Sequence, residues 1–141
     1  MELDSKLQEE IERLCKEGDD YFESDDLERS EAKFLEALEL VPDPNTDWES
    51  STWILAALAD VYFSIGQYKS AQEILLDVMN CPGAIGNPFL HLRLGQVQLE
   101  LDNNDQAADE LTRAYMGAGE EIFEDDDGKY FNFLKTKIII D

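Results

Sequence analysis

Along most of this chain, apolar residues recur every three or four positions with charged residues between them, a spacing typical of amphipathic helices. It predicts a long first helix over about residues 4–24 and a second helix that ends before Pro42. The polar turn at residues 24–26 can cap the second helix, because serine and aspartate oxygens accept hydrogen bonds from free backbone amides. Together these two elements predict a helical hairpin.

Four more helices are expected from the same spacing and from the turn residues between them. They are predicted at about residues 47–65, 68–80, 89–101 and 105–116, with a proline- and glycine-rich loop at 82–88. Thr46 and Glu49 fit a capping box at the start of the third helix. Beyond Gly119 we expect one or two short helices that cover the last hairpin, with the acidic run 124–127 capping the final helix.

One sparse pattern recurs three times in the same register, at offsets of 41 and then 36 residues, close to the ~34-residue period of two-helix repeats. Its copies are Leu14, Gly18, Tyr21, Ser30, Phe34 and Ala37; Leu55, Ala59, Tyr62, Ala71, Leu75 and Val78; and His91, Gly95, Gln98, Ala107, Leu111 and Ala114. The chain is therefore predicted to be one all-α domain, residues 1–141. Its hairpins are expected at about 4–42, 47–82 and 88–117, with a cap over 119–141.

These positions resemble the signature of the tetratricopeptide repeat (TPR), which implies a right-handed α-solenoid of three TPR-like hairpins. Glu17, His91 and Gln98 depart from the signature, because leucine, a bulky apolar residue and an aromatic residue are usual there. The segment 114–123, together with 129–131, also resembles the tail of small bacterial TPR proteins, some of which belong to the toxin-immunity type.

The resemblance implies that the first helix of each hairpin lines a concave face that binds a partner. The candidate partner-binding residues are Glu12, Asp19, Phe22, Glu23, Trp53, Asp60, Phe63, Phe89, Gln96 and Glu100. No lysine or arginine occupies these positions, so we expect a groove without cations that binds a basic, partly apolar segment of another protein rather than a peptide carboxylate. The alternative is that the aromatic residues fill the core between hairpins and the carboxylates form a solvated face.

The charge balance limits the possible partners. The chain has 33 acidic and 11 basic residues, a net charge of -22, and residues 1–50 hold 18 of the acids and 5 of the bases. Such a field repels phosphate backbones and anionic lipid, so we expect neither nucleic acid nor a membrane as partner. The N-terminus lacks the features of a signal peptide and no stretch reaches the ~20 apolar residues of a membrane span, which predicts a cytoplasmic protein.

Catalytic chemistry, metals and cofactors are not expected from this sequence. Cys15 and Cys81 have no CxxC spacing, so we expect both to be reduced, semi-buried thiols; the alternative is a disulfide between repeats. His91 lies among leucines, as a packed histidine does, and no second histidine exists to complete a metal site. The run 125–128 fails as a calcium loop, because Phe123 and Leu134 would stand where carboxylates are required. The sequence therefore favours a non-enzymatic adaptor.

Three more specific functions stay open. One is an immunity protein that neutralises a basic toxin, such as a nuclease, by covering its nucleic-acid surface with carboxylates. Another is a secretion or assembly chaperone that shields the apolar segment of a client. The last is self-association as a homodimer through the apolar run Ile138–Ile140.

Overall fold

The computed structural model describes residues 3–124 and 128–139, and within these ranges every regular element is a helix. The α-helices are α1 (Ser5–Glu23), α2 (Leu27–Leu40), α3 (Glu49–Ser64), α4 (Tyr68–Val78), α5 (Pro88–Glu100), α6 (Asn104–Ala118) and α7 (Lys129–Lys135). Two 3-10 helices, η1 (Asn45–Asp47) and η2 (Glu120–Phe123), lie between them. The predicted all-α class is confirmed.

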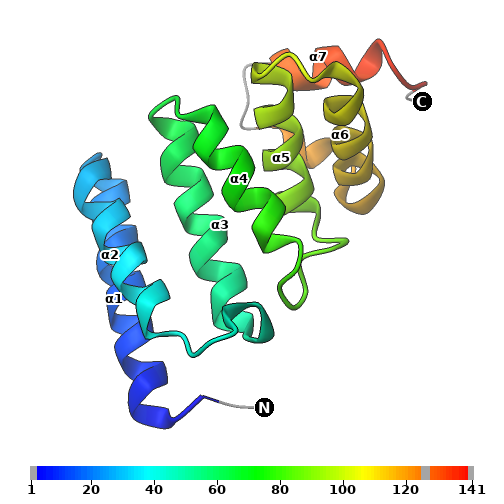
Figure 1. Cartoon of the computed structure of the whole chain (residues 1–141). Helices are drawn as coiled ribbons and strands as arrows, with labels where there is room; N and C mark the ends of the chain where they lie inside the picture. The colour runs from blue at the N-terminus through cyan, green and yellow to red at the C-terminus, as the bar shows by residue number, and fades with distance from the viewer. Residues whose placement is uncertain (1–2, 125–127, 140–141) are drawn as a thin grey trace.

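Each α-helix packs mainly against its neighbours in the sequence. The closest pairs are α1 with α2, α3 with α4 and α5 with α6, and α2 contacts α3 as α4 contacts α5. Figure 1 shows these three hairpins standing side by side, with α7 lying across the end of the last one. Among the described residues, no helix has the length and apolar character to cross a membrane.

The same turn joins the two helices of every hairpin. Asp25, Gly66 and Asp102 have left-handed backbones, with φ of 62°, 79° and 62°. In each turn this residue donates to a carbonyl three residues back, and the next residue donates to a carbonyl five residues back, as in a Schellman motif. The turn residues are separated by the same offsets as the sequence pattern, so the repeat extends from the sequence to the backbone.

The recurring sequence positions form the contacts within and between hairpins. All of them are buried except Tyr21 and Tyr62, which are half-buried. The two glycines mark close helix crossings: a Cβ at Gly18 would lie 2.8 Å from the Phe34 ring, and one at Gly95 would lie 2.7 Å from the Leu111 side chain. Any larger residue there would overpack the crossing.

Two departures from the TPR signature are explained by hydrogen bonds and ion pairs. The amide oxygen of Gln98 accepts from Gln72 on α4 at 3.0 Å and from Asn103 in the turn at 2.7 Å, so it joins two hairpins where an aromatic ring is usual. Glu17 lies between two cations, Arg13 at 3.0 Å and Lys33 at 3.4 Å. The buried Gln98 side chain is tolerated because it is hydrogen-bonded, whereas Glu17 is only partly buried.

The predicted capping box at the start of the third helix is wrong. Thr46 lies in η1, and α3 begins only at Glu49, with Trp48 in the capping position and no side-chain cap bond. The Trp48 backbone is extended, and its indole Nε1 donates to the carbonyl of Pro42 at 2.9 Å. The Trp48 side chain thus stabilises the loop between the first two hairpins, and no hydroxyl caps α3. In α2, by contrast, the predicted turn supplies the cap, because Asp26 accepts from the Arg29 amide at 3.2 Å.

The C-terminal elements cover the end of the last hairpin, as expected for the cap. Phe123 of η2 and Tyr130 and Leu134 of α7 form a small apolar cluster with Leu111 of α6. The acidic run predicted to cap α7 includes residues 125–127, which lie outside the described residues. This cluster shields the apolar end of the third hairpin from solvent.

Candidate functional site

Two adjoining pockets lie on the side of the molecule formed by the first helices of the hairpins. The acidic pocket, of about 770 Å³, lies between α1 and the start of α3. Its lining residues are Leu3, Ser5, Gln8, Glu9, Ile11, Glu12, Cys15, Trp48, Glu49, Ser50, Trp53 and Ile54. The aromatic pocket, of about 660 Å³, is lined by Thr52, Trp53, Ala56, Gly83, Ile85, Gly86, Asn87, Pro88, Phe89 and Leu90. Trp53 lines both pockets, and together they form what we call the groove.

Carboxylates give the acidic pocket its charge. Glu9 and Glu12 come from one face of α1, and Glu49 comes from the first turn of α3. Gln8 donates to Glu12 at 2.9 Å, and none of the three carboxylates forms an ion pair with a described residue. No lysine or arginine lines either pocket in the ranges that the structure describes. The groove therefore attracts cations.

Large apolar side chains are exposed at the aromatic pocket. Trp53 is 60% exposed, Ile85 73% and Phe89 70%. Isolated exposed apolar residues are common on protein surfaces, but three that line one pocket are typical of a binding site. The pocket is thus suited to an apolar side chain.

The loop that carries Ile85 is held in place from two helices. Thr52 of α3 donates from its hydroxyl to the carbonyl of Pro82 at 2.7 Å. Nε2 of the buried His91 ring accepts from the Gly86 amide at 2.9 Å, so Nδ1 carries the proton and donates to Glu110 at 2.5 Å. His91 is a packed histidine, as the sequence predicts, and its two hydrogen bonds explain why it replaces a bulky apolar residue.

Cys15 lies in the wall of the acidic pocket, and both cysteines are free thiols, as expected. Burial, together with the nearby carboxylates of Asp19 and Glu12, raises the pKa of the Cys15 thiol to about 11. The thiol is therefore protonated at neutral pH. Its position makes it a reporter of what occupies the pocket.

The groove includes three of the ten predicted binding residues: Glu12, Trp53 and Phe89. Asp19, Phe22 and Glu23 lie further along α1, toward its C-terminal end, where Asp19 and Glu23 are exposed and Phe22 packs against the core. Desolvation and then the charges of Glu23 and Asp20 raise the pKa of Asp19 above its usual range. A role of these three residues in binding stays a prediction.

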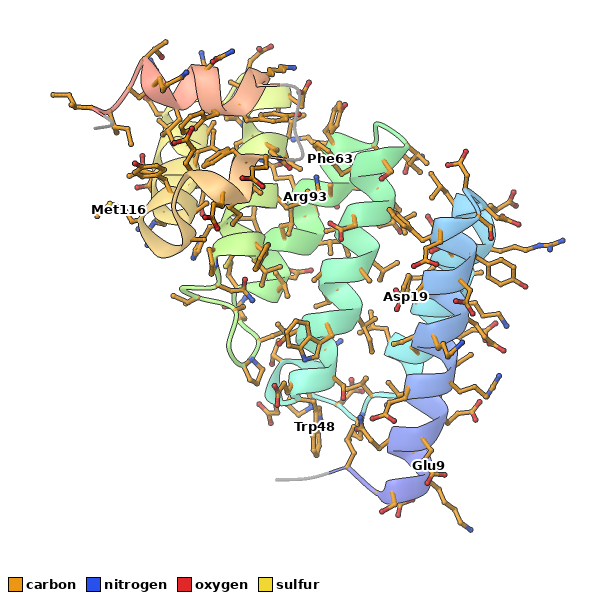
Figure 2. The ribbon with its side chains drawn as sticks, turned by 180° about the vertical axis from the view of Figure 1, so that it is seen from behind. Glu9, Asp19, Trp48, Phe63, Arg93 and Met116 are labelled. Carbon is orange, nitrogen blue, oxygen red and sulfur yellow. The ribbon has the colours of Figure 1, made fainter. Side chains whose placement is uncertain are left out.

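Arg93 binds three more of the predicted residues. Its guanidinium donates to Asp60 at 2.9 Å and to Gln96 at 2.7 Å, and it lies 4.3 Å from the centre of the Phe63 ring. Figure 2 shows Phe63 and Arg93 together, far along α3 from Trp48. The expectation that no cation lies among these side chains is wrong, because Arg93 of α5 reaches across to α3 and pairs with Asp60.

Glu100, the last predicted residue, also has partners within the chain. Lys129 lies 2.5 Å from its carboxylate, and the Tyr130 hydroxyl donates to it at 2.8 Å. Burial and then the hydrogen bond to Glu100 raise the pKa of Tyr130 well above its usual value. Glu100 thus anchors α7 to the end of α5.

Most of the residues that line the groove lie outside the predicted set, among them Glu9, Trp48, Glu49 and Ile85. Ile85 is the one with a signal in the sequence, because a large apolar residue in a glycine- and proline-rich loop needs a reason to be there. The other three lie at positions that the repeat signature leaves unassigned. In the described part of the chain, no group of three or more His, Cys, Asp or Glu side chains is arranged to hold a metal ion.

A scan against models of protein families finds no match for this sequence, and a search of curated proteins finds no similar sequence.

Proposed function

We propose that this chain is a non-enzymatic protein-binding module of the TPR type, a right-handed solenoid that holds a basic, partly apolar segment of a partner protein in the groove. The solenoid is supported by the three hairpins with identical turns and by the burial of the recurring positions. A TPR-type architecture would explain both the identical turns and the burial of these positions.

The proposal depends on one observation: carboxylates and exposed aromatic rings line two pockets that share Trp53, and no lysine or arginine of the described residues lines either pocket. Glu9, Glu12 and Glu49 attract lysine or arginine, while Trp53 and Phe89 offer large rings with little conformational entropy to lose. Aromatic side chains of this kind dominate the energy of many interfaces. The acidic pocket thus suits a basic side chain and the aromatic pocket an apolar one.

The carboxylates on this side of the molecule differ in how readily a partner could reach them. Asp60 and Glu100 already pair with cations of the chain itself, so a partner's lysine would have to displace Arg93 or Lys129. Glu9 and Glu49 need no such displacement. We therefore place the cation-binding part of the site at the N-terminal ends of α1 and α3.

Selection from a library of short random peptides on the immobilised full chain tests this function. We expect the retained peptides to be enriched in lysine or arginine together with leucine, isoleucine or aromatic residues. Binding should weaken with added salt, because the cation contacts are screened. Trp53→Ala should weaken binding of the retained peptides by at least about tenfold.

The matched control is Leu76→Ala, because Leu76 is half-exposed on α4, outside the groove. It should leave binding unchanged. Peptides with no enrichment in basic residues, or equal binding by the Trp53→Ala and Leu76→Ala variants, would contradict the proposal.

A further inference from the structure

The segment that follows α7 has the chemistry that the groove selects. Residues 129–140 contain Lys129, Lys135 and Lys137 and no aspartate or glutamate, in a chain whose net charge is -22. Beyond Lys137, the sequence continues with three isoleucines. A basic and apolar segment therefore lies at the opposite end of the sequence from the acidic residues of α1.

Side chains of this segment are available for contacts. Ile139 is 93% exposed, and Lys135 and Lys137 are exposed as well. The lysine amines lie 5.0 Å and 5.5 Å from the centres of the Phe131 and Phe133 rings. Such exposed cation–π contacts are worth only about 0.5–1 kcal/mol, so carboxylates can compete for the lysines. Neither lysine forms an ion pair with a carboxylate in the described ranges.

The segment does not occupy the groove of its own chain. Its helix α7 is fixed to Glu100, at the opposite end of α5 from Phe89, about 17 Å along the helix axis. Ile138 then packs against the apolar cluster around Leu111, which ties the segment to the last hairpin. In Figure 1, α7 and α1 lie at opposite ends of the row of hairpins.

We propose that the groove binds the segment Lys135–Ile139 of a second copy of this chain, an inference that rests on the proposed function. The two lysines pair with Glu9, Glu12 and Glu49 of the acidic pocket, and Ile139 enters the aromatic pocket between Trp53 and Phe89. Because the two contacting surfaces differ, the association is head-to-tail. It extends into short chains of copies rather than stopping at a symmetric dimer.

Charge repulsion between copies sets the conditions for this association. Each copy carries a net charge of -22, so long-range repulsion opposes contact at low ionic strength. At about 0.15 M salt the screening length is about 8 Å, which weakens that repulsion more than it weakens close ion pairs inside the groove. Association is therefore expected near physiological salt and is reduced at low salt.

Complementation between two damaged copies tests the inference. Trp53→Ala damages the groove and leaves the segment intact, whereas Ile139→Asp damages the segment and leaves the groove intact. Both residues are exposed, so both variants should fold, which circular dichroism checks. Sedimentation equilibrium should show a mass that rises with concentration for the unchanged chain, and monomers for each variant alone. An equimolar mixture of the two variants should form a 1:1 dimer, because it has one intact groove and one intact segment.

Met116→Asp is the control, because Met116 is similarly exposed on α6 and lines neither pocket. It should associate like the unchanged chain. A monomeric unchanged chain at high concentration, or a mixture that stays monomeric, would overturn the inference.

A peptide of residues 135–140, acetylated and amidated, separates this inference from the proposed function. Binding of this peptide by the unchanged chain, lost by at least about tenfold in Trp53→Ala, supports both. If library peptides bind and this peptide does not, the groove serves another basic partner and the inference fails alone. If neither binds, both proposals fail.

Discussion

At the scale of single residues, the reactivity of the Cys15 thiol reports the electrostatic environment of the acidic pocket. Cys15 lines the pocket, and burial with the charges of Asp19 and Glu12 raises the pKa of its thiol to about 11. A cysteine thiolate is the reactive form, so a raised pKa makes the thiol slow to react at neutral pH. The negative charges of Asp19 and Glu12, which help to suppress the thiolate, would favour a cation bound nearby.

Alkylation of Cys15 by iodoacetamide tests this electrostatic environment. In a Cys81→Ala background, the reaction at pH 8 should be roughly a hundredfold slower than that of an unperturbed cysteine. The rate should rise about tenfold per pH unit between about pH 7 and 9.5 without reaching a plateau, because the pKa lies above this range. Glu12→Gln should speed the reaction by removing one of the charges that raise the pKa. A plateau near pH 8.5 would contradict the raised pKa.

The sequence predicts individual groove residues only in part. Trp53 and Phe89 could be predicted, because their positions in the repeat fix which way they point. The partners of Asp60 and Glu100 could not be predicted in the same way. Arg93 is at a position that the repeat signature does not assign to the concave face, and its long side chain reaches back to α3. Lys129 comes from α7, whose position relative to α5 depends on packing that no local pattern encodes.

At the scale of helices, local signals were enough to place the hairpins. The turn residues Asp25, Gly66 and Asp102 and the prolines between hairpins fix where helices end, so the predicted bounds lie close to the observed ones. The predicted start of α3 was wrong because the Trp48 indole donates a hydrogen bond to the Pro42 carbonyl. This contact depends on the shape of the loop, which the sequence pattern does not show.

Helix α7 contributes to stability through one fully buried leucine, Leu134. Truncating this side chain tests how much the helix stabilises the fold. Leu134 is 0% exposed within the cluster that covers the last hairpin. Leu134→Ala should lower the free energy of unfolding by about 2–5 kcal/mol, because it leaves a cavity in that cluster. Urea denaturation measures this change.

The destabilisation should be local, because each repeat unit contacts mainly its neighbours. Hydrogen exchange in the Leu134→Ala variant should quicken in α5 and α6 before it quickens in α1 and α2. Leu76→Ala, the same substitution at a half-exposed site, should change stability by about 0.5 kcal/mol or less. Equal effects of the two substitutions would contradict the role of α7 as a cover.

At the scale of the whole molecule, charge is distributed unevenly. Residues 1–50 hold 18 of the 33 acidic residues and 5 of the 11 basic ones, whereas residues 129–140 carry lysines and no acids. The repulsion is greatest in the first hairpin. Within it, Asp19 and Glu23 lie on the C-terminal half of α1, where the helix dipole also disfavours negative charge.

Neutralising this pair should therefore stabilise the fold, and the gain should depend on salt and pH. Because the pKa of Asp19 is raised in the folded state, its ionised form destabilises the fold at pH 7, and the effect disappears as the pH falls below the pKa of the unfolded chain. In low salt, Asp19→Asn with Glu23→Gln should raise the urea midpoint. The gain in the free energy of unfolding should be about 0.5 kcal/mol or less, because both side chains are exposed. The gain should shrink in about 0.5 M NaCl and at about pH 2.5. The control, Glu73→Gln with Asp77→Asn, removes two exposed charges with the same spacing from α4, outside the acidic first hairpin, and should give a smaller gain. An equal gain from both pairs, unaffected by salt, would show that charge crowding in the first hairpin is not what limits its stability.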